Sequence, residues 1–375
     1  MQTGQVAGGR TGGAAGLIRL LGRKVVITRV VTLLVTVLTL VLKLNEGGDV
    51  IIFVLSAIAL AGLAALVGDC TDQLGHRLGP GATGVLQSAL GNLPELFISI
   101  FALQAGLIVV VQTALVGSIL ANSLLVLGLA FLAGGLKHGV QTFGSTQTKM
   151  ISTLLVLSVA SLAIPTLATA PGGPDVGHAD DLSLISALVL LGVFAASIPF
   201  SLRGGPGASA ELEDQPREML WPILLTVGLL LAAATGAAFV SDWFVEALKP
   251  TMSSLGLSEA FVGLVIVAIA GNAVENVVGV QMAVRNKPDL AISLIMNSSL
   301  QVALALTPAL VIISQFMGGT HLTLVLPGLL LVAIGFTALL GAFVVYDGES
   351  TWLEGAALIG LYIIIAASVW WGPHI

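Results

Sequence analysis

Apolar stretches of about 20 residues, the length that crosses a lipid bilayer as a helix, follow one another along almost the whole chain. Of the 375 residues, 56% are hydrophobic and only 9% are charged, and the mean hydropathy is +1.04. A soluble domain carries about a quarter of charged residues. The apolar runs are continuous and do not alternate with polar residues, as the strands of a transmembrane barrel would. The sequence therefore predicts an all-α polytopic membrane protein.

About eleven stretches are long and apolar enough to form transmembrane helices. They are Val25–Leu44, Val50–Gly68, Ala82–Leu103, Leu107–Ala133, Met150–Ala170, Leu182–Leu202, Met219–Val240, Ala260–Ala283, Leu290–Phe316, Leu322–Val345 and Trp352–Trp371. Tryptophans lie near several of their ends, where interfacial aromatic residues are common.

The basic residues predict the orientation of the chain. With the N-terminus in the cytoplasm, nearly all lysines and arginines between the stretches fall on the cytoplasmic side, and only Lys43 and Lys249 fall outside. This bias indicates a cytoplasmic N-terminus and an external C-terminus. The formal net charge of −6 gives no support to nucleic-acid binding. The Ala- and Gly-rich composition favours a prokaryotic plasma membrane, and the state of oligomerisation stays open, a homo-oligomer included.

A polar motif inside the apolar region occurs twice. "GNLPE", which begins at Gly91, returns as "GNAVE", which begins at Gly271, an offset of 180 residues. The same offset aligns "LVGSILANSLL" with "IMNSSLQVALA" without a gap, so a pair of helices is duplicated. The two copies lie five predicted helices apart. An odd number of helices turns the second copy upside down in the membrane, as in many secondary transporters.

The duplication predicts two inverted five-helix repeats and one extra N-terminal helix. We expect residues 1–24 to form a disordered cytoplasmic tail, 25–44 the extra helix, 50–203 the first repeat, 204–218 an acidic linker and 219–372 the second repeat. The linker is interpreted as solvated, and a short acidic helix that attracts cations or regulates transport is the alternative.

Each motif places a glutamate, Glu95 or Glu275, near the middle of a predicted span. A charge at this depth costs about 3 kcal/mol or more and must be neutralised by a proton, an ion or a partner. Arg29 is expected near the cytoplasmic end of the first span, and no lysine or arginine lies deep in any span. An ion pair between a basic side chain and Glu95 or Glu275 is therefore not expected, which leaves a proton or a cation to neutralise the two glutamates.

The available ligands narrow the type of cation. All five histidines fall in predicted loops or the C-terminal tail, and the single cysteine, Cys70, is interpreted as a small buried residue. The membrane interior thus offers oxygen ligands, which hard cations such as calcium prefer, whereas zinc and copper favour imidazole or thiolate. Ser88, Asn92, Glu95 and Ser99 form one stripe along a helix. Pro94 and Gly91 are expected to break that helix, and the second copy, which has no proline, is expected to bend less.

The candidate cation site is a set of carboxylates, amides, hydroxyls and freed backbone carbonyls from both motifs. It comprises Glu95, Glu275, Asn92, Asn272, Gly91, Gly271, Ser118, Asn122, Ser298 and Gln301. Asp69 and Asp72, at the predicted cytoplasmic end of the second span, are candidates for a cation entrance or are ordinary helix-end charges.

These motifs resemble the two signature repeats of the calcium/proton exchangers in the cation/calcium exchanger superfamily. The resemblance rests on "GNLPELFISIFAL", on "GNAVENVVGVQMAVRNKPDLAISLIMNSSLQ" and on "DCTDQLGHRLGP", and it covers roughly residues 50–345. It implies eleven helices, an acidic connector between two inverted halves, and binding of calcium by Glu95 and Glu275 in exchange for protons. Two departures are Asn276, where the family usually has histidine, and Asn297, where it has a small residue.

The predicted function is a secondary active antiporter, not an enzyme, that exports Ca²⁺ in exchange for H⁺ by alternating access. Its ligands are Ca²⁺, other hard divalent cations and H⁺, with the lipid bilayer as its surroundings and no resident cofactor. A sodium/calcium exchanger of the same superfamily is the nearest alternative. A cation channel and an intramembrane hydrolase that uses the carboxylate pair are the others.

Overall fold

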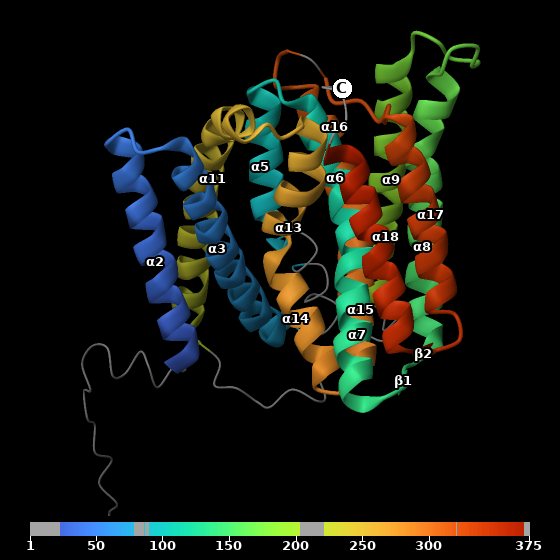
Figure 1. Cartoon of the computed structure of the whole chain (residues 1–375), viewed down its shortest axis with the longest axis horizontal. Helices are drawn as coiled ribbons and strands as arrows, with labels where there is room; N and C mark the ends of the chain where they lie inside the picture. The colour runs from blue at the N-terminus through green and yellow to red at the C-terminus, as the bar shows by residue number, and fades with distance from the viewer. Residues whose placement is uncertain (1–22, 79–85, 87–89, 203–220, 320, 371–375) are drawn as a thin grey trace, which may run out of the picture.

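The computed structural model describes residues 23–78, 86, 90–202, 221–319 and 321–370. These residues are almost entirely helical, as the apolar runs predict (Figure 1). The predicted acidic linker lies outside the described residues, as does nearly all of the predicted N-terminal tail.

The first half of the chain contains α2 (Arg23–Leu44), the long helix α3 (Asp49–Leu78) and the short helix α5 (Leu93–Gln104). The polypeptide continues through α6 (Ile108–Leu120), the π-helix η1 (Ala121–Val126), α7 (Leu127–His138), the two-residue strand β1 (Gln141–Thr142), α8 (Ser145–Thr169) and α9 (Ala179–Leu202).

The second half begins with α11 (Ile223–Leu255) and a broken helix made of α12 (Glu259–Phe261), the π-helix η2 (Val262–Val267), α13 (Ala268–Gly271) and α14 (Ala273–Val284). It ends with α15 (Pro288–Gln301), the π-helix η3 (Val302–Leu306), α16 (Thr307–Ser314), α17 (Gly328–Val344), strand β2 (Glu349–Ser350) and α18 (Trp352–Trp370). Strands β1 and β2 pair antiparallel, which joins the two halves.

Within the described residues, eight helices are long and apolar enough to cross a membrane, or nine if the bent pair that ends in α14 is one span. Two further apolar helices, α5 and α17, are shorter. The chain is therefore an integral membrane protein. Helices α3, α7 and α11 extend past the predicted boundaries. His76 and His138 therefore lie in helices and not in loops, and Trp243 lies inside α11 and not near its end.

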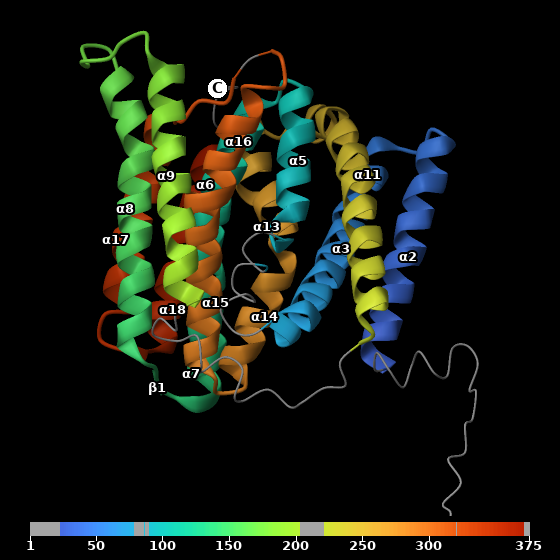
Figure 2. The ribbon, with the colours of Figure 1, turned by 180° about the vertical axis from the view of Figure 1, so that it is seen from behind.

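The helices form a bundle in which α2 lies at one edge, α3 and α11 follow, and α8, α9 and α17 lie at the opposite edge (Figures 1 and 2). In the most apolar windows of the two central spans, Ile108–His138 and Pro288–Ser314, 83% and 78% of the residues are buried. The corresponding share for α2 is 11%. The duplicated polar residues of these central spans are therefore held inside protein and away from lipid.

We call the face where α2 begins and where α3, α7 and α14 end the lower face, and the face where α5 and α11 end the upper face (Figure 1). On the lower face, two side chains in the last turn of α7 and one from β1 donate to the carbonyls that end α14. Lys137 Nζ and His138 Nε2 lie 3.0 and 2.9 Å from the carbonyl oxygen of Val284, and Gln141 Nε2 lies 3.0 Å from that of Ala283. These bonds fix the lower end of α14 to α7.

The helix breaks fall at the two Gly-Asn pairs. Asn92 has φ −89° and ψ 13°, Asn272 has φ −108° and ψ 19°, and each is followed by a new helix. Pro94 does not itself break a helix, because it lies in the first turn of α5, where its missing N–H has no helical partner to lose. The second copy bends by 65°. The bend of the first copy involves residues outside those described, so the expected difference between the two stays a prediction.

The predicted span Leu322–Val345 begins as extended backbone, and its helix, α17, starts only after Pro327. Extended backbone inside a bundle needs partners for its polar groups, and side chains supply them. The amides of Leu322, Leu324 and Leu326 donate to the hydroxyls of Ser314, Ser183 and Thr166 over 2.9–3.0 Å.

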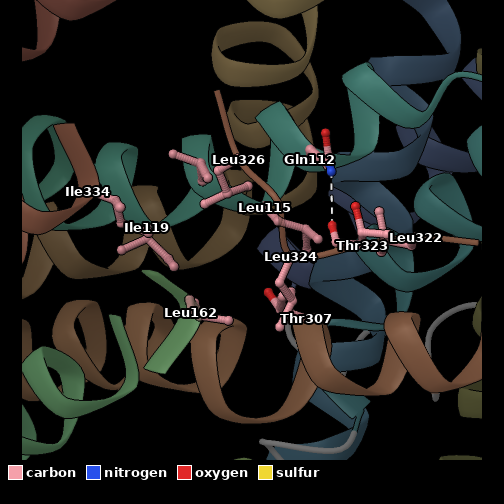
Figure 3. Close-up of a pocket in the computed structure, with 11 residues that line it drawn as sticks. Gln112, Leu115, Ile119, Leu162, Thr307, Leu322, Thr323, Leu324, Leu326 and Ile334 are labelled. Atoms are coloured by element: carbon pink, nitrogen blue, oxygen red, sulfur yellow. Dashed lines mark hydrogen bonds between the residues drawn. The ribbon is translucent and has the colours of Figure 1, made fainter. Parts of the chain in front are cut away.

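Gln112 holds the other side of the extended segment. Its amide donates to the carbonyl oxygens of Thr323 and Val325 over 2.9 and 3.1 Å, and the first of these bonds is drawn in Figure 3. The small cavity beside it is lined mainly by leucine and isoleucine side chains and includes none of the predicted site residues. The cavity is therefore an apolar packing gap and not a candidate cation site.

Candidate cation site

The two glutamates sit at equivalent places, in the first turns of α5 and α14. Each follows the Gly-Asn break, so each carboxylate lies beside the start of a helix. The first amides of a helix have no intrahelical partners, and the helix dipole favours negative charge there. The break therefore makes the position of each glutamate less unfavourable for a carboxylate than the middle of an unbroken helix.

Glu95 is completely buried, with 0% of its surface exposed. Ser118 of α6 donates a short hydrogen bond to Glu95 Oε1. Asn272, from the second motif, donates to Glu95 Oε2 over 3.5 Å and to Ser118 Oγ over 3.0 Å. The carboxylate of the first motif is thus held by one residue from each half of the chain.

Gly271 allows the two motifs to pack closely, because it has no side chain that would press against Glu95. A Cβ atom at position 271 would lie 3.3 Å from Cβ and 3.4 Å from Cγ of Glu95. A larger side chain here would displace Glu95 or widen the gap between the motifs. The Gly-Asn pair therefore serves two purposes, because Gly271 gives the space and Asn272 gives the hydrogen bonds.

Glu275 has a different environment. Glu275 is only partly buried, and its carboxylate interacts with its own backbone amide. Glu275 lies in the first turn of α14, four residues after Gly271, where a Cβ atom would be 3.3 Å from Cβ of Glu95. The two glutamates thus belong to one site, in which Glu95 is sealed and Glu275 is more accessible.

The remaining predicted ligands connect the two halves in pairs. Asn92 Nδ2 lies 3.4 Å from Gln301 Oε1, and Asn122 Nδ2 lies 3.0 Å from Ser298 Oγ. Both pairs are buried. The structure therefore brings the polar residues of all four duplicated helices into one layer, as the sequence predicts, although it arranges them as hydrogen-bonded pairs around the glutamates.

Sequence reasoning missed one pair in this layer, Ser123 and Ser299, whose hydroxyls are 3.0 Å apart. The sequence contains a hint of this pair, because each serine directly follows a predicted ligand, Asn122 or Ser298. Both serines lie on the η1–α15 contact, where the π-helical turn changes which residues face the partner helix.

Three oxygen atoms at the motifs are buried without a hydrogen-bond partner in the described part of the chain. They are Asn272 Oδ1, Asn276 Oδ1 and Ser99 Oγ. Buried polar atoms normally have partners. The described residues contain no group of three or more histidine, cysteine, aspartate or glutamate side chains that could hold a metal. Any cation bound here would therefore be coordinated by two carboxylates together with neutral oxygens.

The two candidate entrance residues differ in their surroundings. Asp69 pairs with Arg29 of α2, whose guanidinium also donates to the carbonyls of Gly62 and Ala65 over 3.0 Å. Arg29 therefore pairs with Asp69 and with neither glutamate, because α3 is longer than predicted and brings Asp69 opposite it. Asp72 is exposed one turn further on. Cys70, between them, is buried as predicted.

The chain matches the family described as "Sodium/calcium exchanger protein" over residues 49–203 and 225–371. A Ca²⁺/H⁺ antiporter of Synechocystis is 33% identical over 349 residues, which cover 87% of this chain and 92% of the relative. The Ca²⁺/H⁺ antiporter ChaA of Bacillus subtilis is 35% identical over 325 residues, covering 84% and 91%. The structure of native YfkE aligns with a TM-score of 0.79 at 30% identity, covering 92% of this chain and 99% of that one.

Proposed function

Because this chain belongs to the sodium/calcium exchanger family, we propose that it exchanges Ca²⁺ for H⁺ across a membrane by alternating access at Glu95 and Glu275. The observation that carries the proposal is the burial of the Glu95 carboxylate against Gly271 and Asn272 of the second motif, whose helix α14 carries Glu275 in its first turn. The antiport activity of the relatives and their coverage of most of the chain support the same function.

The chemistry of the site suits a cation that alternates with protons. No basic side chain among the described residues bonds to Glu95 or Glu275, so their charge needs another neutralising group. One Ca²⁺ ion can neutralise both carboxylates, and so can two protons. The two forms exclude each other, which couples calcium release to proton binding and prevents a leak. Calcium is therefore the cargo, and no resident cofactor is required.

The proposed ligands are the two carboxylates and the neutral oxygens that surround them. Glu95, Glu275, Ser118 and Asn272 form the centre, with Asn272 Oδ1 as a buried oxygen that still lacks a partner among the described residues. Asn92, Asn122, Ser298, Gln301 and the backbone at Gly91 and Gly271 complete the polar layer. Calcium accepts six to eight oxygen ligands in flexible geometry, which suits a set of this kind.

We assign the accessible side of the site to the lower face, which we propose is cytoplasmic. Glu275 is partly exposed and lies in the first turn of α14, which runs to the lower face, whereas Glu95 is sealed. Asp69 is occupied by Arg29. Asp72, one turn further along α3, is exposed, and we propose that it attracts cations to the entrance.

The proposed architecture has about eleven membrane-crossing helices, arranged as two inverted repeats of five with α2 as the extra helix. The π-helices η1 and η3 follow α6 and α15 at positions that the 180-residue offset relates, which supports this arrangement. We propose that the N-terminus is cytoplasmic, the C-terminus external and the membrane a prokaryotic plasma membrane, in keeping with the bacterial relatives.

The test is calcium uptake into proteoliposomes with an acidic interior, where the proton gradient drives the exchange. We expect uptake that collapses with the pH gradient and is lost in Glu95→Gln and Glu275→Gln. The exposed Glu349→Gln variant serves as the matched control and keeps its activity.

Three results would contradict the proposal. Uptake that follows a sodium gradient and ignores the pH gradient would identify a sodium/calcium exchanger. Calcium flux without counter-transport would identify a channel. Uptake that survives replacement of both glutamates would remove them from the transport site.

A further inference from the structure

Ser99 of α5 is a buried polar group that the proposed cation site leaves unused. Its surface is 1% exposed, and its Oγ has no hydrogen-bond partner in the described part of the chain. Buried polar atoms normally have partners. A hydroxyl that is sealed from solvent and unpaired in one conformational state is therefore a candidate to bind a ligand in another state.

The position of Ser99 relative to Glu95 follows from the geometry of the helix. Ser99 comes four residues after Glu95, so it lies on the same face of α5, about 6 Å closer to the upper end. On that face, Glu95 accepts hydrogen bonds from Ser118 of α6 and from Asn272 of the second motif. Ser99 therefore faces the interior of the bundle, one helical turn above the sealed carboxylate.

The inward face of α5 continues from Ser99 to a cavity at the upper face. This cavity of about 220 Å³ lies between the end of α5 and the end of α16, and its lining includes Leu103, Gly106 and Ser314. The two helix ends lie side by side in Figures 1 and 2. Leu103 comes four residues after Ser99, and Ala102, between them, is small and buried. One turn of helix therefore separates the unpaired hydroxyl from the cavity.

The second motif has no counterpart of this hydroxyl. The 180-residue offset takes Ser99 to Gly279 of α14. A Cβ atom at Gly279 would lie 2.7 Å from Cγ1 of Ile295, so α14 and α15 pack too closely there to leave room for a side chain. The hydroxyl therefore belongs to the first motif alone, and this is the motif whose glutamate is sealed in this structure.

Resting on the alternating access proposed above, we propose that Ser99 is a transit ligand for the cation on its way from Glu95 to the upper face. When the upper side opens, Ca²⁺ leaves the carboxylates and binds the Ser99 hydroxyl oxygen before it reaches the upper cavity. Calcium accepts neutral oxygens among its six to eight ligands. The neighbouring buried side chains of α5, Ile98 and Ala102, carry no oxygen. Ser99 therefore lowers the barrier to release without adding to binding at the central site.

The first test separates the rate of transport from the affinity for calcium. Ser99→Ala should slow the maximal rate of pH-gradient-driven uptake about tenfold, because one contact between a charge and a hydroxyl is lost during release. Its calcium affinity in detergent, measured by isothermal titration calorimetry, should stay within about twofold of the wild-type value. The control is Thr337→Val, which also removes a buried, unpaired hydroxyl, but from α17 at the opposite edge of the bundle. The control should keep both the rate and the affinity.

The stability of Ser99→Ala excludes a trivial loss of folding. Since the Ser99 hydroxyl has no partner to lose, the variant should unfold at or above the temperature of the wild-type protein. An unchanged uptake rate in Ser99→Ala would overturn the proposal. A loss of calcium affinity as large as the loss of rate would also overturn it, because Ser99 would then belong to the central site.

A cysteine at this position gives a readout that needs no transport assay. Ser99→Cys is made in a Cys70→Ala background, since Cys70 is the only native cysteine. In right-side-out membrane vesicles supplied with calcium and an acidic medium, an impermeant thiol reagent should modify Ser99→Cys far faster than Thr337→Cys. Equal rates for the two variants, or modification in inside-out vesicles only, would contradict an outward route past Ser99. Failure of the wild-type protein to take up calcium under a pH gradient would instead refute the proposed function, whereas modification of Ser99→Cys from outside would still locate the route.

Discussion

The two repeat-related serines should contribute unequally to calcium binding. Ser118 donates to the buried carboxylate of Glu95, whereas Ser298 accepts from the neutral amide of Asn122. A hydrogen bond to a charged group is worth about 1.5–3 kcal/mol, and a neutral one about 0.5–1.5 kcal/mol. Since Ser118 and Glu95 are both fully buried, water does not replace the lost donor.

Ser118→Ala should therefore weaken the apparent calcium affinity by about 10- to 100-fold, and Ser298→Ala by about 2- to 10-fold. The assay is the initial rate of pH-gradient-driven uptake into proteoliposomes as a function of calcium concentration. Ser118→Thr, which keeps the hydroxyl, should retain more of the affinity than Ser118→Ala.

One result would refute the unequal contribution of Ser118 and Ser298. If Ser298→Ala weakened calcium binding as much as Ser118→Ala, the hydrogen bond from Ser118 to Glu95 would contribute no more to calcium affinity than the bond between Asn122 and Ser298. The two halves would then contribute symmetrically, in contrast to the different environments of Glu95 and Glu275. Gel filtration and thermal unfolding in detergent establish that both variants are folded before the rates are compared.

Three further predictions concern the scaffold. Gly117→Ala should lower the free energy of unfolding by about 1–3 kcal/mol, because its Cβ would lie 2.3 Å from the carbonyl oxygen of Leu264. The control is Gly228→Ala, whose Cβ would lie in open space. Thermal unfolding in detergent measures the stability of both variants. Gln112→Leu should cost about 1–3 kcal/mol by leaving the partly buried carbonyls of Thr323 and Val325 without the side-chain donor of Gln112, and an unchanged melting temperature would refute this. Arg29→Gln and Asp69→Asn should show a coupling energy of about 1 kcal/mol in a double-mutant cycle of unfolding, because they break one ion pair. If the losses of stability in the two single variants simply add up in the double variant, the ion pair does not hold α2 against α3.

The positions of most helices and of the two helix breaks are determined by nearby residues, and the sequence predicts them well. Helices in a membrane satisfy their own backbone, so a run of apolar residues is enough to predict a helix. The Gly-Asn breaks also arise locally, and the helices begin again at Leu93 and Ala273. The gathering of the duplicated polar residues into one layer follows from their duplication together with their cost in hydrocarbon.

The start of α17 shows where local reasoning fails. The residues from Leu322 to Pro327 are as apolar as a helix, yet they are extended. Hydroxyls and an amide from distant helices satisfy their backbone, and no local pattern announces those partners. The two strands β1 and β2 are equally invisible in the sequence, because two residues carry no periodicity and their pairing joins segments far apart.

Tertiary structure alone decides how the two copies of the motif differ. The sequence predicts two equivalent glutamates, but packing seals Glu95 and leaves Glu275 partly exposed. It also pairs Asp69 with Arg29, whereas Asp72 is exposed one turn further on. Each of these outcomes depends on where α3 and α11 lie against the central helices. That arrangement is a property of one conformational state, whereas the sequence is shared by every state that the protein adopts.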